Sequence, residues 1–497
     1  MDPVELLRLL VFHEYWFAIA ENAFLQYPRL TSTQQSQIAQ RVIVLKEALT
    51  QSGLDKVDDT LVTLAALTPE MSHRKGNLLD QTFDFQPTVS PSVLAQMVSW
   101  VKRGQLITEE CRALLAESPS TAIPFVHRVL LLFANFWFGY PLLLKQQRAL
   151  IYRQLNTQQG QQLARYAVEQ LDRPYPDPAE TLLHESACCV PGALEGLHFR
   201  ILQRGITLPT ELFQGADTQT RDALLERLPS DPEPYLTLGI LASIGDPVVK
   251  EQLLRFQVTQ PAWVSRLYFD VLSHTLGAGW QLNADGTIRY LTYDACFQLV
   301  SKKNILHRFP LSTPIHVLSE LTSEHCRWCG RAMVTLFDFD LLDARLKFLG
   351  LTGKRLRIIT CLDCIMMTNA TPTVFVNVDF NGNTSWHDSN GLFAKARPLE
   401  EDLIDDIDYE EIRDIFALDV EPRPVLESYM LNAGVSQIGG HPKWLMDIEN
   451  PYPQCPNCNQ LMPFIGQVQL SDFGYEEGII YAFLCASCHV AATHCQG

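Results

Sequence analysis

Four CxxC pairs constrain the fold of this chain more than any other feature of its sequence. They are Cys326/Cys329, Cys361/Cys364, Cys455/Cys458 and Cys485/Cys488. Two cysteines separated by two residues can form a tight turn that directs both sulfurs to one point, and zinc prefers four such ligands in a tetrahedron. A shell of four cysteines leaves no open coordination position, so zinc held in this way is structural. We therefore expect these cysteines to bind two structural zinc ions per chain.

Strand-like segments connect the pairs as a zinc ribbon requires. Residues 333–339 and 356–360 separate the first two pairs, and residues 462–470 and 479–484 separate the last two. In each case the segments can form a β-hairpin that brings one CxxC turn to the next. Because each half has its own hairpin, we expect sequential pairing into two zinc ribbons.

The two cysteine units share further residues, which suggests a weak internal duplication. A methionine lies four residues after the second cysteine in both units, at Met333 and Met462. The residue directly after that cysteine is Gly330 in one unit and Asn459 in the other, and both types tolerate a positive φ angle. Such a backbone lets N–H groups face the sulfurs.

Two other interpretations of these cysteines agree less well with the sequence. Cys485-Ala-Ser-Cys488-His489 matches a c-type haem attachment motif. Haem attachment needs export and an axial partner, and it leaves Cys455 and Cys458 without a role. A redox dithiol needs a thioredoxin-like βαβ context, which the sequence lacks. Four nearby residues are expected to be bystanders or to contact the ligands: His325, His489, His494 and Cys495.

The start of the chain and its cysteine content predict a cytoplasmic protein with no membrane segment. The chain has 497 residues, 47% of them hydrophobic, which suggests two to four domains. Residues 6–25 contain charges and do not form a signal peptide. The uncharged and strongly apolar run at residues 129–144 is shorter than the roughly 20 residues of a membrane span, so we expect a buried helix there, with membrane contact as the alternative. Thirteen cysteines without an export signal indicate metal rather than disulfides.

The first 280 residues have the pattern of helices. Asp-Pro or Ser-Pro pairs recur at expected helix starts, where the polar side chain accepts from early N–H groups and the proline fixes φ. These pairs are Asp2-Pro3, Ser90-Pro91, Asp177-Pro178, Asp231-Pro232 and Asp246-Pro247. Residues 231–256 resemble a HEAT-type helix pair, so we expect a solenoid-like region, with an irregular helical domain as the alternative.

From Trp280 onward the pattern becomes mostly β. Asp285-Gly286 lies between short β-prone runs and predicts a hairpin turn. Residues 374–380 alternate apolar and polar, Asn381-Gly382 forms a turn, and residues 384–386 return as a second strand.

An acidic segment, residues 400–421, interrupts the β pattern. It contains eleven acidic residues and one arginine, a net charge of −10 out of −17 for the whole chain. Its apolar residues fit one face of a helix: Leu403, Ile407, Ile412, Ile415 and Phe416. The segment is either a solvated acidic face or a docking surface for a basic partner.

The charge balance disfavours nucleic acid as the main partner. Lysine and arginine number 39 against 56 acidic residues, so the field of the protein repels phosphate. No lysine or arginine follows Lys443, which removes phosphate contacts from the second ribbon. Weak binding is conceivable only at the first ribbon, which has five cations: Arg327, Arg331, Lys354, Arg355 and Arg357.

No catalytic or cofactor-binding motif is evident. The sequence lacks GxSxG, HExxH, Walker and GxGxxG patterns. His387-Asp388-Ser389 contains the residue types of a catalytic triad, but adjacency in sequence does not make a triad. Asp338, Asp340 and Asp343 lie close together without the glycine and distal glutamate of a calcium loop. We therefore expect a protein that is not an enzyme.

An ordered set of motifs lies in the C-terminal region. It comprises Gly439-Gly440-His441-Pro442-Lys443-Trp444, the 455–458 pair, Met462-Pro463-Phe464-Ile465-Gly466-Gln467, and the aromatic run 481–485. This order resembles the YwqG-like family of bacterial proteins and is similar to the C-terminal part of the programmed cell death protein 2 family. The resemblance covers residues 434–497 and extends back to residue 320 when the internal duplication is included. It implies a β-rich fold and, for the second family, chaperone-like binding of another protein.

These patterns together predict an α+β protein. We expect a helical domain in residues 1–172, a HEAT-like helical region in 173–280, and a β-rich domain with two zinc ribbons in 281–497. The predicted function is binding of another protein, as a bacterial immunity or antitoxin protein or as a dedicated chaperone. An acidic binder suits a basic client such as a toxin or a ribosomal-type protein. The alternatives are a nucleic-acid-associated zinc-ribbon factor and an enzyme whose site is assembled across domains.

Overall fold

The computed structural model describes the C-terminal two thirds of the chain most fully. The described residues are 32–53, 62, 91, 94–95, 97–98, 152–153, 155–171, 177–283, 285–301, 313–366, 372–391, 416–427, 435–445, 452–473 and 478–497. The chain divides into two compact units, one of residues 1–151 with 166–182 and one of residues 152–165 with 183–497. The predicted apolar helix at 129–144 lies outside the described residues. The three-region division of the sequence stays a prediction.

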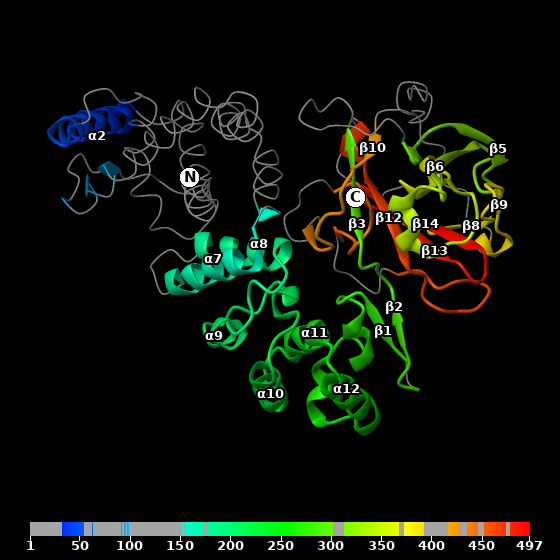
Figure 1. Cartoon of the computed structure of the whole chain (residues 1–497), viewed down its shortest axis with the longest axis horizontal. Coiled ribbons are helices and arrows are strands. Elements are labelled where there is room, and N and C mark those ends of the chain that lie inside the picture. Colours follow the sequence, from blue (N-terminus) through cyan, green and yellow to red (C-terminus); the bar gives the residue numbers. More distant parts are fainter. Residues whose placement is uncertain are drawn as a thin grey trace. The chain divides into compact units, whose positions relative to one another are not determined.

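Helices dominate the described residues up to 275. The α-helices are α2 (Ser32–Gln51), α7 (Thr157–Gln170), α8 (Asp177–Cys189), α9 (His198–Gln203), α10 (Thr218–Arg227), α11 (Pro234–Ile244) and α12 (Pro247–Thr259). Short 3-10 helices connect them: η5 (Thr210–Phe213), η6 (Leu228–Ser230), η7 (Ala262–Arg266) and η8 (Val271–Thr275). Figure 1 shows α10, α11 and α12 following one another in the green part of the chain. The structure is thus mixed α and β, and a solenoid stays a prediction.

Two predicted helix starts have different outcomes. Asp246 caps α12, because its carboxylate accepts from Val249 N at 2.8 Å and Pro247 is the first helical residue. Asp231 does not start α11, which begins at Pro234. Its carboxylate instead accepts from Glu233 N at 3.0 Å and from the Thr237 hydroxyl, so it holds the loop before the helix.

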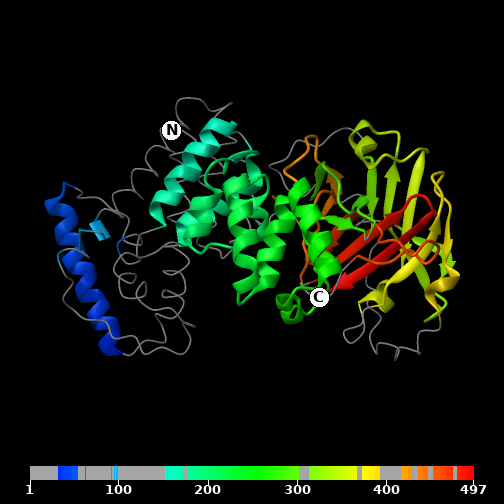
Figure 2. The ribbon, with the colours of Figure 1, turned by 90° about the horizontal axis from the view of Figure 1, so that it is seen from below.

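The β region contains two larger sheets and one small hairpin. The hairpin joins β1 (Trp280–Leu282) to β2 (Ile288–Tyr290) around the predicted Asp285-Gly286 turn. The eight-stranded sheet has the order β10-β3-β11-β12-β13-β14-β8-β9. Its strands are β3 (Cys296–Ser301), β8 (Val374–Val378), β9 (Thr384–Trp386), β10 (Phe416–Leu418), β11 (Gln437–Gly439), β12 (Phe464–Gln469), β13 (Ile479–Cys485) and β14 (Val490–Gln496). The red strands β13 and β14 lie beside the yellow β8 and β9 in Figure 2.

The smaller sheet has four strands and packs on the larger one. Its strands are β4 (Ile315–Val317), β5 (Leu321–His325), β6 (Ala332–Asp340) and β7 (Arg355–Thr360), with β6 paired to the other three. Thr360 and Thr493 share a buried hydroxyl hydrogen bond of 2.7 Å between the sheets. Gly466 of β12 lies close to Phe337 of β6, since a Cβ added at Gly466 would lie 3.5 Å from the ring Cζ, an ordinary packing distance. One apolar core therefore joins both sheets.

The end of the acidic segment corrects one prediction. Phe416 was expected on the face of a helix, yet Phe416–Leu418 form β10 and pair with β3. Phe416 is buried and its ring lies 5.1 Å from that of Phe473. Strand pairing and burial outweigh the helical periodicity here, since a short apolar run fits either element. Residues 400–415 lie outside the described residues.

Candidate metal centres

The eight paired cysteines meet in two groups of four. Cys326, Cys329, Cys361 and Cys364 form the first centre, and Cys455, Cys458, Cys485 and Cys488 form the second. Within each group the sulfurs all lie within 4.8 Å of one another. This is the sequential grouping expected from the two hairpins.

The sulfur spacing suits a tetrahedral metal ion. A Zn–S bond of about 2.3 Å in a regular tetrahedron places neighbouring sulfurs about 3.8 Å apart. In the first centre, Cys326 Sγ lies 3.7 Å from Cys364 Sγ, and Cys329 Sγ lies 3.5 Å from Cys361 Sγ. In the second, the Sγ atoms of Cys458 and Cys485 are 3.8 Å apart. The residues thus fit a divalent ion with four thiolate ligands, and its identity as zinc stays a prediction.

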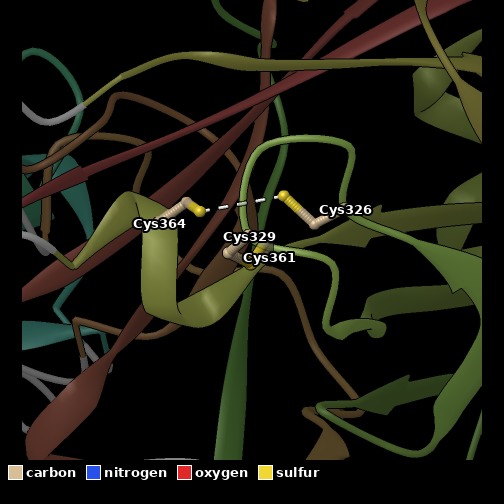
Figure 3. A group of neighbouring side chains, drawn as sticks. All are labelled: Cys326, Cys329, Cys361 and Cys364. Atoms are coloured by element: carbon tan, nitrogen blue, oxygen red, sulfur yellow. Dashed lines mark hydrogen bonds between the residues drawn. The ribbon is translucent and has the colours of Figure 1, made fainter. Parts of the chain in front are cut away.

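The first centre joins a backbone turn to a short helix. The turn begins at Cys326, directly after β5, and Gly330 N donates to Cys326 O at 2.8 Å. Gly330 has a φ of 81°, as its position in the turn predicts. Cys361 follows β7, and Cys364 lies on α13 (Leu362–Ile365). Figure 3 shows the two halves facing each other, with Cys364 directed from the helix toward Cys326.

The second centre repeats the first turn but not the second. Asn459 N donates to Cys455 O at 2.8 Å, and Asn459 has a φ of 56°, matching the role of Gly330. The other pair lies in the tight connection between β13 and β14, where His489 has a φ of 57°. Met333 and Met462 are both fully buried. The duplication thus extends to the first turn of each unit and to its methionine.

The thiols in each centre shift the pKa values of their neighbours. Hydrogen bonds with Cys361 and Cys364 lower the pKa of Cys326 to about 2. The same bonds raise the pKa of both partners, which keep their protons. In the second centre, burial opposes ionisation of Cys485, yet hydrogen bonds from the Ser487 side chain and the Cys488 backbone lower its pKa to about 7. A divalent ion would replace the protons that remain, because a metal binds the thiolate form.

The neighbouring histidines and Cys495 belong to neither group. His325 Nδ1 lies 2.9 Å from Ser323 O, and the ring of His489 packs against Phe380 at 4.9 Å. His494 and Cys495 lie on β14. Within the described part of the chain, the groups of potential ligands contain none of these residues.

The arginines around the first centre face carboxylates. Arg331 Nε lies 3.3 Å from Asp363, and Arg327 Nη1 lies 2.7 Å from Asp388. Arg357 pairs with Glu320 at 2.9 Å. Arg355 pairs with Asp338, which is only 5% exposed. These pairs neutralise much of the positive charge that the sequence places here.

The residues considered for catalysis serve local structure. His387 Nδ1 accepts from Ser389 N at 3.1 Å and lies 2.7 Å from Ser389 Oγ, which closes a turn at the start of η10 (Asp388–Asn390). Asp343 accepts from Arg345 N at 2.9 Å and begins η9 (Ala344–Leu349). Asp340 accepts from Leu342 N at 3.1 Å.

A buried ion network in the second unit has no counterpart in the sequence analysis. Glu427 is 1% exposed and accepts from Arg153 Nε at 2.9 Å. Arg423 lies 3.8 Å from the same carboxylate and donates from Nε to Cys296 Sγ at 3.3 Å. Its other nitrogen donates to Gln437. No local motif could reveal this network, because Arg153 and Glu427 are 274 residues apart.

The aromatic residues of the C-terminal motifs form the apolar core around the second centre. Trp444 stacks on Phe483 at 6.2 Å and lies 4.8 Å from Tyr481. Gln467 is fully buried, donates to Val435 O at 2.8 Å and accepts from Lys443 N at 2.9 Å. These residues therefore have structural roles that do not depend on any resemblance.

Comparison with known proteins gives one informative match. "Uncharacterized protein YpfL" of Salmonella typhimurium (strain LT2) is 30% identical over 357 residues, which cover 70% of this chain and 79% of the relative. No family model matches the chain, and no solved structure matches it. Among the described helices, none is both long and apolar enough to cross a membrane.

Proposed function

The chain belongs to the family of YpfL, and we propose that it is a zinc-stabilised protein that binds a basic protein partner. The observation that carries this proposal is the all-cysteine ligand set of both centres. Four thiolates leave zinc no position for a substrate or a water, so the ions would stabilise a fold rather than catalyse. The function then lies in the surfaces that this fold presents.

The acidic charge of the chain selects the kind of partner. The net charge is −17, and residues 400–421 contribute −10 of it. Arginines near the first centre are paired with carboxylates, which weakens the case for nucleic acid there. An acidic surface accelerates encounter with a basic protein. This chemistry fits an immunity or antitoxin protein that binds a basic toxin. It also fits a chaperone that binds a basic client, and the resemblance to the programmed cell death protein 2 family supports the chaperone.

The helical region supplies the second part of the proposal. We infer that the successive helices of residues 173–280 form a HEAT-like solenoid, which would present an extended face to the partner. An enzyme remains the weaker alternative, because the His387 and aspartate clusters serve local turns and ion pairs.

Affinity capture followed by binding kinetics tests the proposal. The full chain, purified with its metal, should retain a basic protein from its host, and the purified pair should associate more slowly as salt rises. Replacing Asp405, Asp406, Asp408, Glu410 and Glu411 by Asn or Gln should slow association roughly tenfold at low salt and flatten its salt dependence. A matched control replaces five exposed acidic residues that lie outside both the 400–421 segment and the helical region 173–280: Glu47, Glu169, Asp285, Asp340 and Asp388. An equal loss in both variants would remove the 400–421 segment from the site, and capture of nucleic acid alone would refute the proposal.

A further inference from the structure

A small polar pocket lies between the helices and the β strands of the second unit. Its volume is about 70 Å³. Glu211 and Gln214 border it from η5 and the residue after it, and Ser243 borders it from α11. Thr292 and Tyr293 come from the β2–β3 connection, and His441 follows β11. The other lining side chains are apolar. Segments far apart in the sequence thus converge on one site, as is common for ligand pockets.

Among the described residues that line the pocket there is one carboxylate, that of Glu211, and no lysine or arginine. Glu211 is only 7% exposed, so its charge acts in a poorly solvated space where electrostatic attraction is strong. An anionic ligand such as a phosphate or a carboxylate would meet repulsion from Glu211 and no cation among the described lining residues. The lining therefore selects for positive charge.

Hydroxyl groups in the lining add hydrogen-bonding capacity. Ser243 Oγ is buried and has no hydrogen-bond partner within the described residues, which is unusual for a buried hydroxyl. Burial raises the pKa of Tyr293 to about 12, so this phenol stays neutral at physiological pH. The ring of Tyr293 is held edge-on to Phe348 at 5.6 Å. His441 is fixed as a wall, because its Nε2 lies 2.8 Å from Gly277 O and its Nδ1 3.1 Å from Pro442 O.

We propose that this pocket binds a small cationic group with N–H donors, a guanidinium or a primary ammonium. Glu211 would supply the counter-charge, Ser243 Oγ would accept a hydrogen bond, and Tyr293 would supply an aromatic wall for the cation. The group would belong to a free small molecule or to an arginine or lysine side chain of another protein. This site is separate from the metal centres and goes beyond the protein-binding function proposed above.

Titration of the full chain with methylguanidine and methylammonium, followed by NMR chemical shifts, tests the site. Acetate and inorganic phosphate serve as anionic probes. We expect at least one cation to bind and neither anion to do so. Glu211→Gln should weaken cation binding roughly tenfold or more, and Ser243→Ala about threefold, because an ion pair with a carboxylate outweighs a hydrogen bond to a neutral hydroxyl. Glu233→Gln, an exposed carboxylate outside the pocket, should leave binding unchanged.

Substitutions at Gln214 provide a second test of the site that does not depend on whether Glu211→Gln folds. The Gln214 side chain is exposed at the pocket, so substitution there should not affect the core. Gln214→Glu should tighten cation binding several-fold and Gln214→Lys should abolish it, with opposite effects on the anions. A blocked Gly-Arg-Gly peptide distinguishes the two sources, since it should match methylguanidine only if the natural ligand is a side chain. Failure of both cations to bind at tens of millimolar, tighter binding of an anion, or equal affinity in both Gln214 variants would overturn the proposal.

Discussion

The two metal centres have the same ligands but different positions in the β region. The first lies among β5, β6 and β7 of the four-stranded sheet, and its last ligand is on a short helix. The second lies at the open end of the β12–β13 hairpin, where these central strands of the eight-stranded sheet begin and end. All seven residues of β13 pair with β14. The two centres therefore have the same ligands but anchor sheets of different size. We expect loss of the second centre to destabilise more of the fold than loss of the first.

The largest expected effect is the loss of one ligand from each centre in turn. The parent protein should contain two zinc ions per chain, and Cys455→Ser and Cys326→Ser should each contain one. Because structural metal binding is coupled to folding, Cys455→Ser should unfold the eight-stranded sheet, whereas Cys326→Ser should mainly expose the amides of β5–β7. Elemental analysis and hydrogen exchange of the two sheets measure both effects.

Cys495→Ser is the matched control for these substitutions. Cys495 is buried on β14 but is not a ligand, so this variant should keep both ions. A parent protein with fewer than two ions would contradict the zinc assignment. Equal exchange in both sheets for both ligand variants would contradict the inequality of the centres.

A second prediction concerns the glycines of the larger sheet. Gly439 has a φ of 71°, and an added Cβ would lie 2.3 Å from Ala295 O. Gly439→Ala should therefore cost about 3 kcal/mol or more in the free energy of unfolding, from backbone strain and overlap together. Gly330 of the first centre has a φ of 81° but no atom within 4 Å of an added Cβ. Gly330→Ala should cost only about 1–2 kcal/mol. Denaturant unfolding of both variants measures the difference. An equal loss of unfolding free energy in both variants would show that the atoms around Gly439 move to accept the added methyl group.

The helices and the sheets should also differ in their response to acid. Burial lowers the pKa of His184, His198 and His274, so folding favours their neutral forms. The unfolded chain binds more protons below the ordinary histidine pKa of 6.5, so stability is complete above that pH and falls as the pH drops toward the lowered values. Hydrogen exchange in α8–α11 between pH 7 and pH 5 should show this loss.

His274→Gln should reduce the acid effect in the helices, because it removes one of the three groups. Metal release would act on β5–β7 and β12–β14 instead. Because burial also lowers the pKa of His494 on β14, exchange in β5–β7 is the measurement that separates the two causes. Unchanged protection of α8–α11 down to pH 5 would contradict the prediction.

The smallest expected effect lies at the surface of the first centre. Arg327 and Asp388 form an exposed pair, with side chains 63% and 88% exposed. Such pairs contribute about 0–1 kcal/mol, so Arg327→Ala should barely change the unfolding midpoint or the zinc content. The fully buried Arg423, replaced by Met, serves as the contrasting variant. It should destabilise strongly, because the substitution removes the buried donors to Gln437 and Cys296 and one of the two arginines that face Glu427. A large loss in Arg327→Ala would indicate that this arginine supports the centre itself.

Local sequence patterns predicted the parts of the fold that short segments determine. The CxxC turns, the positive φ at Gly330 and Asn459, and the hairpin around Asn381-Gly382 depend on neighbouring residues only. The pairing of β3 with β10 and β11 could not be predicted, because no local rule specifies which distant strands will meet. The same holds for the contact between Arg153 and Glu427. Asp231 is not the cap that the Asp-Pro pattern predicts, because α11 begins three residues later and the carboxylate accepts from the Thr237 hydroxyl inside that helix.

The place of β3 has a consequence for how the chain folds. Ser301 pairs with Phe416 and Cys296 with Gly439, so the larger sheet closes only after long stretches of chain have been brought together. The sulfurs of Cys458 and Cys485 are 27 residues apart, and closing that loop costs less entropy. We therefore expect metal uptake to come first and to organise the β12–β13 hairpin on which β11 and then β3 assemble. Metal supply during synthesis would then govern the rate at which folded protein appears, in addition to its final stability.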